Sequence, residues 1–156
     1  MTEEIQQNDQ PVFNMDKIYV KDISLEIPHA PHIFLERDNP QIEVQLQSQA
    51  APLDEGVFEV VVTATVTAKL GEKVMFLIEV KQAGIFQVRN IPNDDTEVVL
   101  AVTCPNILFP YLREVVSDVS VRGGFAPVVL NPLNFEVLYQ QQKQQQQAAA
   151  AGETTH

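Results

Sequence analysis

Few side chains in this sequence could perform covalent chemistry or hold a metal ion. Cys104 is the one cysteine among 156 residues, and His29 and His32 lie three apart in a proline-punctuated stretch. A Cys–His pair can form a nucleophile, but no orienting motif surrounds either partner. Two imidazoles without an acidic or thiol companion at ligand spacing make a poor metal site. The sequence therefore predicts no catalytic residue, no metal and no cofactor.

Acidic side chains in two predicted strands are spaced to share one face. In a strand over 17–26, Asp22 and Glu26 are four residues apart, so both point the same way at a period of two. In a strand over 74–88, Leu77 and Glu79 likewise share a face. The opposite faces are predicted to hold Lys21, Ile23 and Leu25 in the first strand and Phe76, Ile78 and Val80 in the second. If the apolar faces turn inward, the outer face is either a docking surface for a basic, partly apolar partner or a solvated sheet face without one.

The charge balance limits the class of partner. Twenty-one acidic residues against ten Lys and Arg give a formal net charge of -11, which repels nucleic acid and anionic lipid and attracts basic proteins. The N-terminus lacks the basic start and the apolar stretch of a secretory signal, so we expect a cytosolic protein. Unbroken apolar runs are only a few residues long, which predicts no membrane insertion.

The elements that must position these residues change character along the chain. Strands are predicted over 17–26, 41–47, 57–68 and 74–88, with a turn at Gly71 joining the last two. A helix of about three turns is expected from Asp94, capped there and stopped or bent before Pro105. A second helix is predicted from Asn106 to Gly123, with Pro110 in or next to its first turn.

A last helix is predicted to begin at Asn131 and Pro132. Because strands come first and helices last, the fold class is α+β with an antiparallel sheet. Residues 1–16 are acidic and poor in apolar groups, so they are expected to form a mobile arm. Residues 17–140 would form the domain, and 141–156 a low-complexity Gln/Ala tail that can prolong a helix but should fray.

Several ordered strings resemble the SecB family of export chaperones over about residues 13–140. The most specific reads CPNILFPYLRE from Cys104 to Glu114. The others are IYVKDISLE (18–26), APHIF (30–34), VTAKLGE (66–72), GIF (84–86), RGGF (122–125) and PLNF (132–135).

This resemblance implies a four-stranded antiparallel sheet with helices on one side, assembled as a dimer of dimers. It implies a chaperone without ATPase activity that binds unfolded precursor proteins and delivers them to the motor ATPase SecA. The SecA-docking residues of the family match Asp22, Glu26, Leu77 and Glu79 in type. In this chain the Gln/Ala tail replaces the more mixed C-terminal region with which family members also touch SecA.

The resemblance also implies a client groove lined by apolar side chains. On this chain those residues would be Phe34, Ile42, Val44, Leu46, Phe135 and Leu138. The same positions could instead belong to the core or to a subunit interface. Two other hypotheses stay open: an acidic scaffold that binds one folded basic partner, and a hydrolase that uses Cys104.

Overall fold

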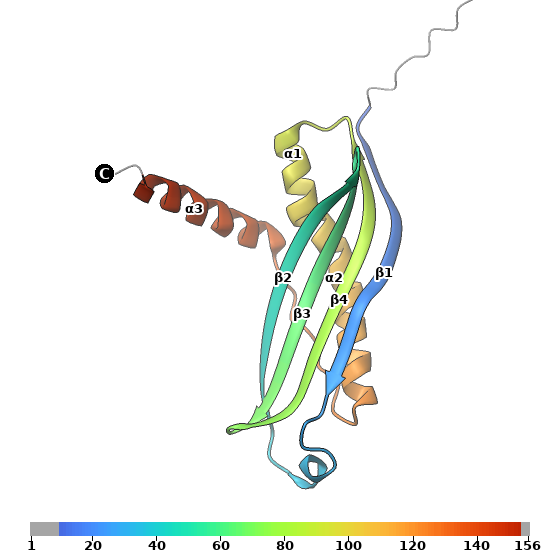
Figure 1. Cartoon of the computed structure of the whole chain (residues 1–156), viewed down its shortest axis with the longest axis vertical. Coiled ribbons are helices and arrows are strands. Elements are labelled where there is room, and N and C mark those ends of the chain that lie inside the picture. Colours follow the sequence, from blue (N-terminus) through green and yellow to red (C-terminus); the bar gives the residue numbers. More distant parts are fainter. Residues whose placement is uncertain (1–9, 154–156) are drawn as a thin grey trace, which may run out of the picture.

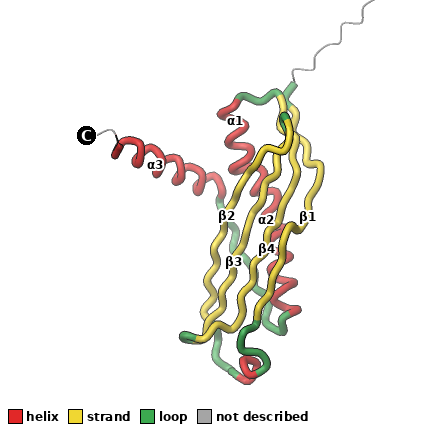
Figure 2. The backbone as a smooth tube through the Cα atoms, viewed as in Figure 1, coloured by secondary structure: helices red, strands yellow, loops and turns green. Residues whose placement is uncertain are grey.

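A computed structural model describes residues 10–153, and one antiparallel sheet of four strands organises that part of the chain (Figure 1). The strands lie side by side in the order β1-β4-β3-β2. Their bounds are β1 (Val12–Glu26), β2 (Gln41–Asp54), β3 (Val57–Leu70) and β4 (Lys73–Arg89). Helices cover one face of this sheet, and the other face is left open (Figure 2). The α+β class and the antiparallel sheet predicted from the sequence are therefore confirmed.

Alternation over residues 57–68 of β3 and 76–87 of β4 separates the covered face from the open face. In β3, Val60, Val62, Ala64 and Val66 are fully buried. They share the covered face with the buried Phe76, Ile78 and Val80 of β4, as the β3–β4 register requires. The hairpin between these strands turns at Gly71, whose φ of 60° suits glycine. The predicted turn at this glycine is confirmed.

The first strand begins earlier than predicted. Residues 12–16 belong to β1 rather than to a mobile arm, because Phe13 and Met15 alternate onto the covered face and pair with the end of β4. The Phe13 ring stacks on Phe86 with centroids 5.8 Å apart. The rest of the predicted arm, residues 1–9, lies outside the described residues.

The helix layer is one continuous helical stretch that does not stop before Pro105 but changes its winding there. Helix α1 (Asn93–Val98) runs through a π-helical turn, η2 (Val99–Thr103), into α2 (Cys104–Arg122). In that turn the Cys104 N–H donates to the Val99 carbonyl, five residues back. This wider winding accommodates the ring of Pro105, which would collide with the preceding turn of a regular α-helix.

The predicted caps of this stretch are wrong. Neither Asp94 nor Asn106 caps a helix, because α1 starts after Pro92 and α2 has no free N-terminus. Pro110 consequently lies inside α2 rather than in a first turn. By length and composition the stretch Asn93–Arg122 could cross a membrane, but a core helix passes the same test. Its inner side packs on β3 and β4.

The last helix, α3 (Phe135–Glu153), starts later than predicted. Its first turn is capped by Asn134, whose Oδ1 accepts hydrogen bonds from the Glu136 and Val137 N–H groups at 3.1 and 3.2 Å. The described part of the Gln/Ala tail continues this helix to Glu153. It projects away from the sheet (Figure 1), and residues 141–152 are exposed.

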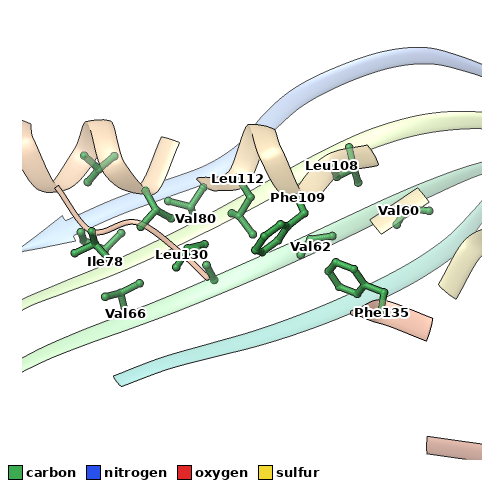
Figure 3. Close-up of a cluster of buried hydrophobic side chains, with 14 of the residues drawn as sticks. Val60, Val62, Val66, Ile78, Val80, Leu108, Phe109, Leu112, Leu130 and Phe135 are labelled. Carbon is green, nitrogen blue, oxygen red and sulfur yellow. The ribbon is translucent and has the colours of Figure 1, made fainter. Parts of the chain in front are cut away.

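The core lies between α2 and the covered face (Figure 3). Leu108 and Leu112 of α2 are fully buried there. The extended segment 124–134 is tied to α2 by three side-chain hydrogen bonds. Arg113 Nε donates to the Leu130 carbonyl at 2.9 Å, Ser117 Oγ donates to the Val128 carbonyl at 2.7 Å, and Ser120 Oγ accepts from the Val128 N–H at 2.9 Å. These bonds fix the point from which α3 starts.

The tightest place in the core yields a stability prediction. A Cβ added at Gly84 would lie 2.8 Å from Phe86 Cε2 and 3.1 Å from Leu108 Cδ2. We expect Gly84→Ala to lower the free energy of unfolding by about 1–3 kcal/mol because both neighbours are buried. Urea unfolding at one fixed protein concentration measures this. Gly152→Ala, with no atom within 4 Å of the added carbon, is the control and should not destabilise the protein. An unchanged urea midpoint for Gly84→Ala would contradict the packing.

Candidate functional site: an acidic sheet face and a cleft beside the last helix

Asp22, Glu26, Leu77 and Glu79 lie together on the open face of the sheet. In the β1–β4 register, Glu26 pairs with Leu77, and Ser24 pairs with Glu79. Asp22 pairs with Lys81, so its side chain points to the same side. We call the four residues Asp22, Glu26, Leu77 and Glu79 the acidic face. The structure therefore brings together all four residues that the charge pattern singled out.

Lys21 departs from the predicted alternation. A β-bulge shifts the register between Val20 and Asp22, so Lys21 has no partner of its own in β4. Lys21 Nζ reaches Glu59 Oε1 at 2.7 Å on the open face. The prediction that Lys21 points inward with Ile23 and Leu25 is wrong, because period-two counting fails wherever a strand carries an extra residue.

Glu59 is the acceptor in the best-connected polar cluster among the described residues of the open face. It accepts hydrogen bonds from Lys21 and from the Tyr19 hydroxyl. The bond from Lys21, followed by that from Tyr19, lowers the pKa of the Glu59 carboxyl. Burial, followed by the bond to Glu59, raises the pKa of Tyr19 to about 12. Sequence reasoning missed this cluster, because Glu59 lies two strands away from β1 in the sheet.

A cleft of about 690 Å³ opens on the covered side, where α3 leaves the sheet, and both apolar and polar side chains line it, Ser48 and Glu97 among the polar ones. Three of the predicted groove residues line it: Leu46, Phe135 and Leu138. Phe135 also belongs to the core, since it is only 4% exposed and contacts the Phe109 ring edge-to-face at 5.9 Å (Figure 3). Further lining comes from Leu100 and Ala101 of the helical stretch, Tyr139, and the glutamines Gln47, Gln49, Gln141, Gln142 and Gln145.

The other three predicted groove residues lie outside this cleft. Ile42 and Val44 are 47% and 42% exposed, on the same side of β2 as Leu46. Phe34 belongs to η1 (His32–Leu35), where its ring stacks on Phe125 at 5.3 Å. Leu100 and Ala101 were missed as lining residues, because nothing in a helical pattern reveals which side will meet a later helix.

Cys104 has no environment for nucleophilic chemistry. It is fully buried at the start of α2, and burial raises the pKa of its thiol to about 12. A neutral buried thiol is a weak nucleophile, which argues against a Cys104 hydrolase. Among residues 10–153 no group of three or more His, Cys, Asp or Glu side chains could hold a metal ion.

The burial of Cys104 yields a prediction about its reactivity. Because its pKa of about 12 leaves almost no thiolate at pH 8, native Cys104 should react with iodoacetamide at least about a hundredfold more slowly than in denaturant. Mass spectrometry of timed, quenched samples measures both rates, with an unstructured cysteine peptide as the reference. A native rate equal to that of the peptide would show an accessible, ionisable thiol and reopen the nucleophile hypothesis.

Comparison with known proteins gives a consistent result. The family described as "Preprotein translocase subunit SecB" matches residues 6–146. The protein-export protein SecB of Methylobacillus flagellatus is 59% identical over 150 residues, covering 96% of this chain and 95% of the relative. That of Aromatoleum aromaticum is 64% identical over 132 residues, covering 84% of this chain and 83% of the relative.

A solved structure shares the fold at low sequence identity. It is the SecB-like chaperone of Mycobacterium tuberculosis in complex with a ChAD peptide from the HigA1 antitoxin, with a TM-score of 0.64 and 16% identity over 78% of this chain and 90% of that one. At this identity the likeness shows the fold alone. The family match and the two relatives cover most of the chain, and the family match over residues 6–146 includes the acidic face and the whole sheet. By these measures the chain belongs to the SecB family of protein-export chaperones.

Proposed function

We propose that this protein is a chaperone of the bacterial cytosol that holds unfolded precursor polypeptides and delivers them to SecA for export. The observation that carries the proposal is a strip of apolar side chains on the covered side of β2. It runs through the exposed Ile42 and Val44 to Leu46, which lines the cleft beside Leu138. An extended polypeptide with apolar side chains fits such a surface.

The strip and cleft favour unfolded chains for a simple physical reason. Apolar burial stabilises by about 25 cal/mol per Å² whatever the sequence, and a folded protein has already buried the groups that would bind. The glutamines around the cleft offer amide donors and acceptors to a client backbone. In addition, β2 is an edge strand that pairs only with β3 among the described strands. The protein can therefore select unfolded clients without recognising a specific amino-acid sequence in them.

Assembly into a tetramer is part of this proposal. On the covered side of β1, Phe13, Met15, Val20 and Ile23 are each at least 37% exposed, and Tyr111 of α2 is exposed beside them. A hollow of about 500 Å³ in this region is lined by Gln82, whose buried Oε1 has no hydrogen-bond partner in the single chain. A second copy of the chain would cover these apolar groups, and we propose a dimer of dimers built on them.

The proposed chaperone function predicts which form of a client is captured. We expect light scattering with mass determination to give about four times 17.4 kDa for the free protein, and a heavier complex with an unfolded precursor but not with the same precursor folded. Leu138→Asp, which places a charge in the cleft, should weaken client binding about tenfold. Val137→Asp is the matched control, because Val137 is exposed on the same helix but does not line the cleft.

The outcomes separate the chaperone from the acidic scaffold. A scaffold for one folded basic partner would ignore the unfolded precursor. Failure to capture any unfolded precursor would therefore overturn the proposed function. Equal loss of client binding in the Leu138 and Val137 variants would move the client site away from the cleft.

The acidic face is the proposed docking surface for SecA. Three carboxylates and Leu77 share one uncovered side of the sheet, in a protein whose net charge is -11. This composition suits a partner surface that is basic and partly apolar. The face lies on the opposite side of the sheet from the cleft, so a bound client would leave it accessible.

Reversing charges on the acidic face tests the proposed SecA docking. Asp22→Lys combined with Glu79→Lys should weaken SecA binding by at least about tenfold and leave client binding unchanged, because rim charges act mainly on the docking encounter. Titration calorimetry at two salt concentrations measures this, and added salt should weaken the wild-type interaction as well. The control is Glu36→Lys with Glu55→Lys, which changes the net charge equally at exposed loop positions. Undiminished SecA binding by the Asp22/Glu79 variant would move docking elsewhere.

A further inference from the structure

The alternation of apolar side chains in β1 shifts by one residue between Val20 and Ile23. On the covered side of β1, Ile18 and Val20 alternate as period two requires, and so do Ile23 and Leu25. Two residues, Lys21 and Asp22, separate these pairs where an unbroken strand allows only one. One of the two must therefore be the extra residue of a bulge, and the apolar pattern alone does not say which.

The register shows that Lys21 is the extra residue. Val20 pairs with Gln82 and Asp22 with the adjacent Lys81, so nothing in β4 is paired with Lys21. As a result, Asp22 faces an opposite charge directly across the strands. If Asp22 were the extra residue, Lys21 would instead pair with Lys81, and two like charges would meet at that position.

One carboxylate binds the bulge residue Lys21 and also Tyr19, two residues before it. Glu59 of β3 accepts from Lys21 Nζ at 2.7 Å through Oε1 and from the Tyr19 hydroxyl through Oε2. Ala83 of β4 lies between the two strands, opposite Tyr19, and is fully buried although it belongs to the open face. Its small side chain leaves room for Tyr19 and Lys21 to reach across β4 to Glu59.

The bonds to Glu59 are more constrained than an ordinary surface ion pair. The Glu59 side chain is only 16% exposed, whereas that of Lys21 is 47% exposed. The bonds from Lys21 and Tyr19 lower the pKa of Glu59, and the ionised carboxylate accepts from both donors at once. A similar bond supports the first bulge of β1, where Gln87 Nε2 donates to the extra residue Asp16 at 2.8 Å.

We propose that Glu59 is a positioning residue for the acidic face: by holding Tyr19 and Lys21, it fixes Lys21 as the bulge residue and leaves Asp22 paired with Lys81. Glu59 is not itself one of the docking residues. It acts through the register of β1, and the inference rests on the proposed docking of SecA at the acidic face.

Removing the carboxylate tests the inference. Glu59→Leu should weaken SecA binding about fivefold without changing client binding. In a fraction of the molecules, Asp22 rather than Lys21 would then be the bulge residue. Glu59→Gln keeps an acceptor oxygen and should retain most of the affinity. Glu43→Leu is the matched control, since it removes a carboxylate from the open face of β2 without touching the bulge.

Deleting Lys21 separates positioning from direct contact. Without Lys21, Val20 and Asp22 are consecutive, so both keep their present partners and no bulge is needed. Deletion of Lys21 in the Glu59→Leu background should therefore restore SecA binding. If Glu59 instead contacted SecA directly, deleting Lys21 could not replace the lost contact, and SecA binding would stay weak. A lack of rescue would therefore overturn the inference.

The register can also be measured without SecA. Cross-strand NMR contacts should join Asp22 to Lys81 in the wild type and in part Lys21 to Lys81 in Glu59→Leu. An unchanged Asp22–Lys81 contact in that variant would overturn the inference even if docking is correct. Should Glu59→Leu fail to fold, Tyr19→Phe with Lys21→Met removes both donors and gives the same test. Failure of the docking proposal itself is recognised separately, by unchanged SecA binding in the Asp22/Glu79 variant.

Discussion

The packing of α2 on the even-numbered residues of β3 and β4 is the interaction on which the rest of this structure depends. Once Val62, Val66, Ile78 and Val80 are buried under that helix, the alternate side chains of the two strands from Phe76 onward, Leu77 and Glu79 among them, must point to the open face. One choice of covered side thus creates both the apolar core and the surface on which Leu77 and Glu79 are displayed.

The same helix also determines where the cleft beside α3 can form. Because the chain stays helical through the π turn and Pro105, α2 extends along the sheet without a break and offers one continuous side to the segment 124–134. Hydrogen bonds from Arg113 and Ser117 hold that segment. Phe135 is then anchored against Phe109, and α3 leaves the sheet beside Leu46. The cleft and the acidic face therefore lie on opposite sides of one rigid sheet.

Several features were predictable from local sequence, and the failures have physical causes. The strands, the Gly71 turn and the shared face of Asp22 and Glu26 follow from period-two alternation and turn chemistry. The helix was predicted to stop or bend before Pro105, but it continues there with a different winding, because a π turn can absorb a proline that a regular helix cannot. The start of β1 was missed because its early residues are held by pairing with the end of β4 and by the stacking of Phe13 on Phe86, both of which lie far along the chain.

By itself, the sequence determined the α+β class, the strand order along the chain, the acidic character of the protein and, through its ordered strings, the resemblance to its family. Alternation and composition are local properties, so they can be read without coordinates. Only the tertiary structure decided which of Lys21 and Asp22 forms the bulge and which apolar residues line the cleft. These outcomes depend on how residues distant in sequence are brought together, such as Tyr19 and Lys21 with Glu59, or Leu46 and Leu138 around one cleft. A local pattern carries no information about such arrangements.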